Sequence, residues 1–291
     1  MRKNFITLGS FDGAHLGHRH LIYAIKDLAA LHKMQSMVLV FDCPPRVVME
    51  GLPAGSVITS GKEKLALLRA LKPGRIAQLN FEDVRGFTPR QFFDILLKKY
   101  KMGGLLAGPD FAFGKGREGH LGFLRKICAE NSVIFMQADF VTQGGHKISS
   151  SLIRRALKEG DVAAAARLLG RPYRLSGKII KGQQLGRKLG FPTANIDVDP
   201  LKILPRGVYA VRAYLGKEVF KSVCNIGIRP TISKNGLPSV EAHLLNFDRN
   251  IYGRVLAVDF IDKIRDEKRF NSLDELKAQI SQDSARAAEI L

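Results

Sequence analysis

The sequence predicts two domains: an α/β domain built on a mostly parallel sheet, then an antiparallel barrel or sandwich that ends in a helix. Strand-like and helix-like segments alternate over residues 1–150, which is typical of a parallel sheet. From about residue 171, strand-like segments follow one another with only Gly, Pro and Asn turns between them, which is typical of antiparallel architectures. A chain of 291 residues has room for both domains.

The first domain opens with a strand at 5–8, then a helix in which Leu21, Ile25 and Leu28 recur on one face, then a strand at 37–41. The same alternation continues. Its further elements are helices at 62–71 and 89–100, strands at 105–107 and 133–136, and a serine-started helix at 152–158. An alanine-rich helix at 161–169 serves as a connector, so we expect the first domain to span 1–170.

The second domain is expected over 171–291. Five strand-like segments lie at 173–180, 208–215, 219–225, 240–247 and 255–261, with an Asn-Gly turn near 234–236. Ser272 and Glu275 form a capping box that opens a helix running to the end of the sequence.

Composition fits a globular protein, with 45% hydrophobic and 25% charged residues. No apolar run is long enough to span a membrane. The three cysteines, Cys43, Cys128 and Cys224, are odd in number and far apart. This spacing favours reduced thiols, and with them a cytoplasmic location.

The net charge of +19 raises the question of nucleic acid. The excess is spread evenly, because residues 1–170 hold 25 Lys and Arg against 14 Asp and Glu, and residues 171–291 hold 21 against 13. No module with aromatic stacking residues is present. We therefore expect small polyphosphate ligands, or simply a basic solvated surface, and no nucleic-acid partner; a nucleic-acid-binding protein is the alternative of another class.

The most informative string is GSFDGAHLGH at residues 9–18, between the first strand and the first helix. Open α/β sheets bind ligands at this position, and the N–H groups at a helix start attract phosphate. Gly9 and Gly17 allow close backbone approach, while His15 and His18 can donate hydrogen bonds to phosphate oxygens. Two alternatives stay open: a zinc site that adds His20, and a purely structural histidine.

Two later strings have the same character. Residues 108–114 (GPDFAFG) follow a strand and place Asp110 and Phe111 near the sheet edge, although a packed turn explains them equally well. Residues 148–154 (ISSSLIR) place hydroxyls and Arg154 at a second helix start, where a guanidinium suits an anionic leaving group. A serine N-cap with a surface arginine is the alternative here.

In the second domain, residues 186–195 (GRKLGFPTAN) combine glycines and basic residues with Thr193 and Asn195, whose oxygens suit Mg²⁺. We expect a mobile loop that covers phosphates. Glu241 is the one carboxylate between Glu218 and Asp248, and it is either a general base or a solvent-facing strand residue. A P-loop and a dinucleotide-binding glycine fingerprint are both absent from the sequence.

Taken together, these strings resemble the bacterial bifunctional riboflavin kinase/FAD synthetases over nearly the whole chain. Further matching strings in the second half are 207–209, 225–227 with 229–231, 241–253 and 264–267. The resemblance implies a Rossmann-like nucleotidyltransferase domain followed by an antiparallel β-barrel riboflavin kinase domain with a C-terminal helix. It also implies two reactions: phosphorylation of riboflavin to FMN, and adenylylation of FMN to FAD with release of pyrophosphate.

The resemblance assigns roles to residues. Glu241 would be the base of the kinase, with Thr193 and Asn195 holding Mg²⁺ and nucleotide. His15 and His18 would stabilise charge during adenylylation, while Ser149, Ser150 and Arg154 would hold pyrophosphate. The remaining ligand-binding positions that it implies are Gly9, Phe11, Gly17, Asp110, Phe111, Gly186, Arg187 and Arg265. The expected partners are riboflavin, FMN and ATP, bound by a monomer or a weak oligomer.

Some positions depart from the family pattern. Residues 43–45 (CPP) lack the usual histidine, Ala112 stands where arginine is common, and His120 stands where an acid is common. Ser151 replaces threonine. These changes weaken the expectation for the adenylylating domain, so the alternative enzyme is a riboflavin kinase whose first domain is slow or uses another nucleotide.

Overall fold

The structure is a computed structural model that describes residues 2–182, 184–227 and 238–291. The turn predicted at 234–236 and residues 229–231 of the family strings lie outside the described residues. Contacts divide the chain into two compact units, residues 1–53 with 57–150 and residues 54–56 with 151–291. Helices α6 (Ser150–Lys158) and α7 (Val162–Leu169) fall almost entirely in the second unit. The functional boundary expected near residue 170 stays a prediction.

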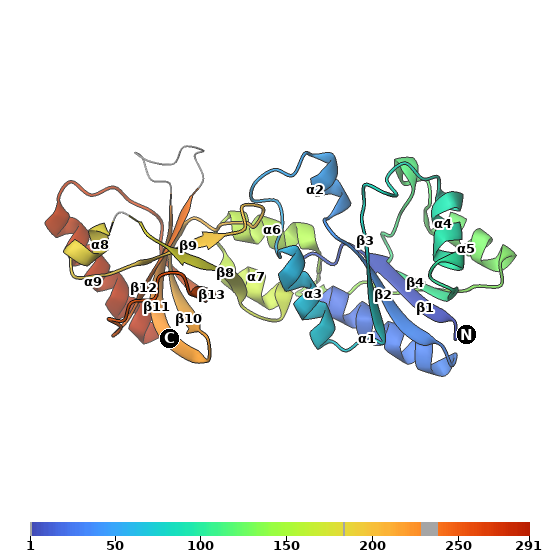
Figure 1. Cartoon of the computed structure of the whole chain (residues 1–291), viewed down its shortest axis with the longest axis horizontal. Helices are drawn as coiled ribbons and strands as arrows, with labels where there is room; N and C mark the ends of the chain where they lie inside the picture. Colours follow the sequence, from blue (N-terminus) through green and yellow to red (C-terminus); the bar gives the residue numbers. More distant parts are fainter. Residues whose placement is uncertain (1, 183, 228–237) are drawn as a thin grey trace. The chain divides into compact units, whose positions relative to one another are not determined.

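The first unit is built on a five-stranded sheet in the order β3-β2-β1-β4-β5, and all of its strand pairs are parallel (Figure 1). This confirms the predicted Rossmann-like domain. The strands are β1 (Asn4–Gly9), β2 (Gln35–Phe41), β3 (Arg75–Leu79), β4 (Met102–Ala107) and β5 (Ile134–Gln137). The chain turns outward in opposite directions from β1 and β4, so the sheet has its switch point between their carboxyl ends.

Helices cover both faces of this sheet. Strand β1 sends Ile6 and Leu8 into one cluster and Phe5 into another, which is why it is buried along nearly its whole length rather than on one face only. Helices α4 (Pro89–Lys98) and α5 (Leu121–Glu130) pack in the first cluster, while α1 (Leu16–Leu31) and α3 (Gly61–Ala70) cover the opposite face. A short helix, α2 (Pro45–Met49), and a hairpin of β6 (Thr142–Gln143) and β7 (His146–Lys147) complete the unit.

The elements that sequence patterns missed are the least periodic ones. Strand β3 lies at the sheet edge and is only partly buried, so it lacks a continuous apolar run. Helix α5 is capped by the ring of His120, which accepts a hydrogen bond from the Phe123 N–H, and histidine is not a common cap.

The second unit is a closed antiparallel barrel in the strand order β10-β11-β12-β9-β8-β13 (Figure 1). Its strands are β8 (Tyr173–Ile180), β9 (Ala194–Val198), β10 (Gly207–Leu215), β11 (Glu218–Gly227), β12 (Ser239–Leu244) and β13 (Val255–Arg265). Helix α9 (Leu273–Ile290) begins at the predicted Ser272 cap and packs Ala287 against Val208 and Val223. The predicted barrel and C-terminal helix are therefore confirmed.

Two details of the barrel differ from the sequence prediction. Strand β12 ends at Leu244, before the expected 247. The string expected to be one mobile loop instead forms a short helix, α8 (Leu185–Lys188), and then enters strand β9 at Ala194. Strand β9 was missed because it directly follows a Gly- and Pro-rich segment, which masks a short buried strand.

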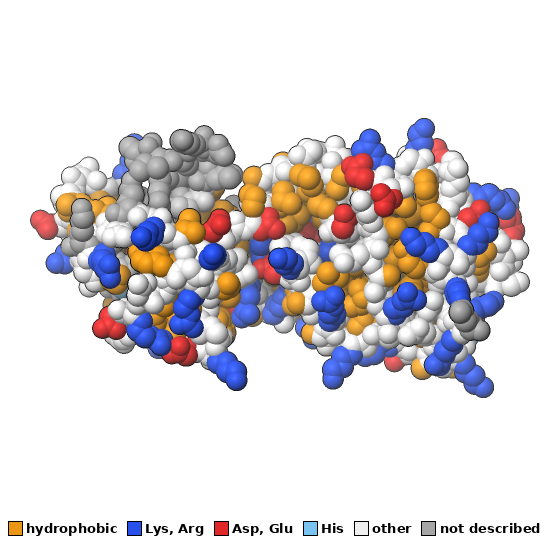
Figure 2. All heavy atoms as spheres, in the orientation of Figure 1, with side chains coloured by type: hydrophobic (Ala, Val, Ile, Leu, Met, Phe, Trp, Pro, Cys, Tyr) orange, Lys and Arg blue, Asp and Glu red, His pale blue; other side chains and the backbone are white. Residues whose placement is uncertain are grey.

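Figure 2 shows Lys and Arg side chains spread over the visible face of both units rather than gathered in one patch. Among the described residues, no helix is both long enough and apolar enough to cross a membrane.

Gly104 in β4 tests the close packing of the first sheet. A Cβ at this position would lie 2.5 Å from a ring carbon of Phe5, which is fully buried and has little room to move. We expect Gly104→Ala to lower the free energy of unfolding by about 1–3 kcal/mol, the usual cost of overpacking. Gly86→Ala, where a Cβ would meet nothing within 4 Å, is the matched control in chemical denaturation. Equal stability of the two variants would contradict the packing argument.

Candidate active sites

A cavity of about 270 Å³ lies at the switch point of the first sheet. It is bounded by the end of β1, the segment after β4 and the segment after β5. Most of the predicted ligand residues of this domain line it: Gly9, Phe11, His15, Gly17, His18, Asp110, Phe111, Ser149 and Ser150. Within the described chain, none of residues 43–45 is part of this lining.

His15 has a structural role in addition to the predicted one. It caps helix α1, because its Nδ1 accepts the His18 N–H at 3.3 Å. A ring nitrogen that accepts a hydrogen bond carries no proton, so the proton of neutral His15 lies on Nε2. The His15 and His18 rings stack with centroids 3.6 Å apart, and Phe11 packs edge-on against His18 at 5.2 Å. Helix capping and ring stacking thus hold both imidazoles at the helix start.

The turn itself is held by Asp12, a residue that sequence reasoning passed over. Its carboxylate is 1% exposed and accepts hydrogen bonds from the Ile58 N–H at 3.0 Å and the Thr59 N–H at 3.1 Å. The Thr59 hydroxyl also accepts the Gly13 N–H at 3.0 Å. These bonds stabilise a turn in which Phe11 has φ 48°, a left-handed conformation unfavourable for a residue with a side chain.

Lys64 supports the neighbouring strand end. The side chain is 2% exposed, and its Nζ donates to the Phe41 carbonyl at 2.6 Å and the Asp42 carbonyl at 3.1 Å. Burial lowers the pKa of Lys64, an effect that the nearby Asp12 partly offsets. The helical pattern of 62–71 carried no sign that this lysine would be buried.

An ion pair lies at the edge of the first cavity. Lys147 of β7 pairs with Asp110, and its Nζ lies 4.1 Å from the centre of the Phe140 ring. Burial lowers the pKa of Lys147. Asp110 therefore already has a cationic neighbour, which the sequence pattern did not reveal.

The serine string joins the histidine turn through its backbone. Ser150 Oγ donates to the Asp12 carbonyl at 2.9 Å, and Ser149 lines the same cavity. Arg154 follows one turn later on α6, in the second unit, and its predicted role stays a prediction.

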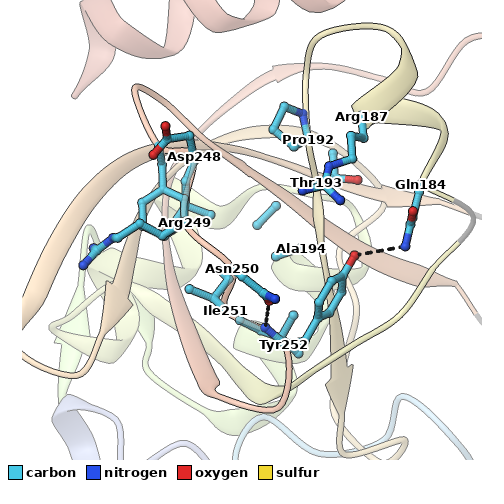
Figure 3. A pocket seen from close by; sticks show the side chains of 14 residues that line it. Gln184, Arg187, Pro192, Thr193, Ala194, Asp248, Arg249, Asn250, Ile251 and Tyr252 are labelled. Atoms are coloured by element: carbon cyan, nitrogen blue, oxygen red, sulfur yellow. Dashed lines mark hydrogen bonds between the residues drawn. The ribbon is translucent and has the colours of Figure 1, made fainter.

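The barrel carries two further cavities, and Thr193 lines both. The smaller, of about 230 Å³, lies between the α8 segment and the loop after β12 (Figure 3). Across it, Gln184 donates a hydrogen bond to the Tyr252 hydroxyl at 3.4 Å, and Arg187 lies on the Gln184 side. Asn250 and Tyr252 are lining residues that sequence reasoning missed; their only signal was membership of the 241–253 string.

The larger barrel cavity, of about 330 Å³, contains Glu241. Glu241 is half-buried on β12, directly opposite Asn195 of β9 and Asn225 of β11. Its Oε2 accepts a hydrogen bond from Thr193 Oγ1 at 3.2 Å, and its Oε1 accepts one from Ser239 Oγ at 3.4 Å. The structure therefore brings together the three predicted residues Thr193, Asn195 and Glu241.

Arg265 also lines the larger cavity, but its charge is already paired. Its guanidinium forms a two-pronged pair with Asp283 of α9, with Nη2 to Oδ2 at 2.8 Å and Nε to Oδ1 at 3.0 Å. Asp283 is almost fully buried and was not predicted. Beside it, burial raises the pKa of Glu267, while Arg206 and Arg265 oppose this. Gly186 lines the same cavity and packs so closely on the Phe191 carbonyl that no Cβ would fit.

The donor set around Glu241 suits a hard cation. Thr193, Asn195 and Glu241 offer hydroxyl, amide and carboxylate oxygens, which are the ligands that Mg²⁺ prefers. Where the structure describes the chain, no group of three or more His, Cys, Asp and Glu is arranged to hold a metal ion.

Comparisons with known proteins agree with this two-unit arrangement. The FAD synthetase family matches residues 1–152, and the riboflavin kinase (Flavokinase) family matches residues 169–291. The bifunctional riboflavin kinase/FMN adenylyltransferase of Escherichia coli (strain K12) is 37% identical, covering 98% of this chain and 91% of its own length. That of Bacillus subtilis (strain 168) is 34% identical, covering 98% and 92%.

A solved structure shares the whole architecture. The crystal structure of a protein described as a macrolide-efflux protein from Streptococcus pneumoniae superposes with a TM-score of 0.85 at 26% identity, covering 99% of this chain and 95% of the other. Both units of the fold thus recur together in another protein.

Proposed function

The chain belongs to the family of bifunctional riboflavin kinase/FMN adenylyltransferases, and from this premise we propose which of its residues carry each activity. The observation that carries the proposal is that each unit has its own cavity lined by groups suited to phosphate chemistry. His15 and His18 line the cavity of the first unit, and Thr193 and Glu241 line the larger of the two barrel cavities.

Glu241 is the general base of the kinase. A base must lie within hydrogen-bond reach of the proton that it takes, and Glu241 faces a cavity from a rigid strand. It accepts the proton of the ribityl hydroxyl while that oxygen bonds to the γ-phosphorus of ATP and ADP leaves. Positioning supplies most of the catalysis in such transfers. The apolar side chains of Val208, Leu276 and Ile280 line the larger cavity and suit it to the flavin ring. The smaller cavity, which Arg187 lines with a positive charge, then binds the nucleotide.

Thr193 and Asn195 would hold Mg²⁺ together with the ATP phosphates. A bound Mg²⁺ neutralises phosphate charge. The residues present fit this role because the Thr193 hydroxyl contacts the Glu241 carboxylate, and Asn195 lies opposite Glu241 in the sheet and lines the same cavity.

His15 and His18 are the catalytic residues of adenylylation. An oxygen of the FMN phosphate bonds to the α-phosphorus of ATP, and the bond from that phosphorus to pyrophosphate breaks. Imidazole N–H groups stabilise the negative charge that develops on the phosphates. Ser149 and Ser150 bind the pyrophosphate, and the first turn of α1 adds backbone N–H donors. A cytoplasmic location agrees with the reduced state of the three cysteines, Cys43, Cys128 and Cys224.

Incubation of the purified chain with riboflavin and MgATP is expected to give FMN first and FAD later, because each unit carries its own site. Chromatographic separation of the flavins over time measures both products. Absence of both products from folded protein would contradict the assignment. Formation of FMN alone would indicate that the first unit is slow, with the missing histidine at residues 43–45 as the first candidate cause.

The two activities should separate by mutation, since the sites lie in different units. Glu241→Gln is expected to slow FMN formation by about 10²–10⁴-fold, the usual contribution of a general base, and to spare conversion of supplied FMN to FAD. His18→Ala should slow that conversion by about 10²–10³-fold and spare the kinase. Glu289→Gln and His32→Ala are the matched controls: they make the same exchanges at exposed positions and should leave both activities unchanged. Equal loss of both activities in a variant that melts normally would refute the two-site assignment.

Chelation should stop both reactions. EDTA is expected to abolish FMN and FAD formation, and excess Mg²⁺ to restore them, because oxygen ligands favour Mg²⁺ over soft metals. Rescue by Zn²⁺ alone, with one zinc bound per chain, would favour the three-histidine alternative.

A further inference from the structure

His243 lies two residues after Glu241 on strand β12, so both side chains leave the strand on the same face. Both line the larger barrel cavity. We propose that His243 is a positioning residue of the kinase, which holds the segment carrying Thr193 against Glu241. This inference rests on the roles proposed above for Thr193 and Glu241.

The contacts of His243 reach the two residues before Thr193. Its Nδ1 lies 2.8 Å from the Pro192 carbonyl oxygen. Since a carbonyl only accepts, Nδ1 carries the proton and donates. The ring also packs edge-on against Phe191, with centroids 5.5 Å apart and planes at 79°. One side chain therefore contacts both Phe191 and Pro192.

The hydrogen bond from His243 to Pro192 connects the two segments just beyond the point where backbone pairing between β12 and β9 ends. The pairing of β12 with β9 matches Glu241 with Asn195 and Ala242 with Ala194, and then stops. The next pair in that register would join His243 to Thr193, but strand β9 begins only at Ala194. The His243 side chain thus connects the two segments one residue beyond the last backbone pair. The Pro192 ring removes one backbone donor from the segment, which makes a side-chain contact to its carbonyl more important.

Thr193 depends on this connection. Its hydroxyl donates to Glu241 at 3.2 Å and lines both barrel cavities. Residues 189–193 lie outside helix and strand, between α8 and β9. Without the His243 hydrogen bond, this segment would spend less time in the arrangement that binds nucleotide. The apparent affinity for MgATP then falls in proportion to the fraction of molecules in the binding-competent arrangement. The turnover rate at saturating MgATP is preserved, because bound nucleotide selects that arrangement.

Two substitutions separate the hydrogen bond from the ring. His243→Phe keeps an aromatic ring beside Phe191 but cannot donate, and His243→Asn places an amide N–H near the position of Nδ1 but has no ring. In the full chain, His243→Phe is expected to raise KM for MgATP in riboflavin phosphorylation about tenfold, equivalent to about 1.4 kcal/mol, with kcat within about twofold. His243→Asn should recover most of that loss.

The first unit supplies the control. Conversion of supplied FMN to FAD and the melting temperature, measured on the same preparations, are expected to match those of the parent chain. His32→Phe, the same exchange at an exposed histidine in the first unit, should change nothing. If His243→Phe does not fold, His243→Leu replaces it as the variant without a donor, and the same KM increase is expected.

Three results would overturn the proposal: an unchanged KM in the variant without a donor, a loss in His243→Asn as large as in His243→Phe, or a fall in kcat with KM unchanged. Failure of the underlying assignment has a different outcome. Full kinase activity in Glu241→Gln would refute the base, whatever the His243 variants show.

Discussion

Closure of the barrel between β9 and β12 is the constraint on which the cavity around Glu241, our proposed kinase site, depends. Only two residue pairs, Glu241 with Asn195 and Ala242 with Ala194, join these strands. The same two pairs complete the ring of strands and place Asn195 directly opposite Glu241, so that both residues line one cavity. A shift of one residue in this register would turn Asn195 to the opposite face from Glu241, because six pairs with β11 hold β12 in place and neighbouring residues of a strand point to opposite faces. The two residue pairs between β9 and β12 therefore both close the barrel and align Asn195 with Glu241.

In the first unit, side-chain hydrogen bonds rather than strand pairing hold the cavity residues in place. His15 and His18, the proposed catalytic residues of this unit, lie at a turn and a helix start rather than on a strand, so hydrogen bonds from other segments must fix the turn. The buried carboxylate of Asp12 does this through Ile58 and Thr59. A turn with left-handed Phe11 and Ala14 would be strained by itself, and the network compensates for that strain. The helix cap formed by His15 then orients its own ring and the neighbouring His18.

Most of the site residues that the sequence predicted line the cavities of the structure, because both sets of residues follow from local patterns. The apolar run of β1, the glycines of 9–18 and the alternation of strands and helices are readable from one segment at a time. Contacts between distant segments were not readable. The pairing of Arg265 with Asp283, the burial of Lys64 and the helix-capping role of His15 depend on which side chain meets which after folding. Strand β9 was hidden for a related reason, since its partner strand, not its own composition, makes it a strand.

The Asp12 network also has a consequence for the order of folding. The histidine string is contiguous, yet the bonds that shape it come from residues 46 and 138 positions away, at Ile58 and Ser150. Closing such long loops is entropically unfavourable, and contacts of this separation generally form late. The strand and helix on either side of the string can form early from local interactions. The turn between them is complete only after Ile58 and Ser150 have formed their hydrogen bonds with Asp12. The cavity of the first unit, which this turn borders, is completed at the same step. A motif that looks local in the sequence is thus one of the least local parts of the folded protein.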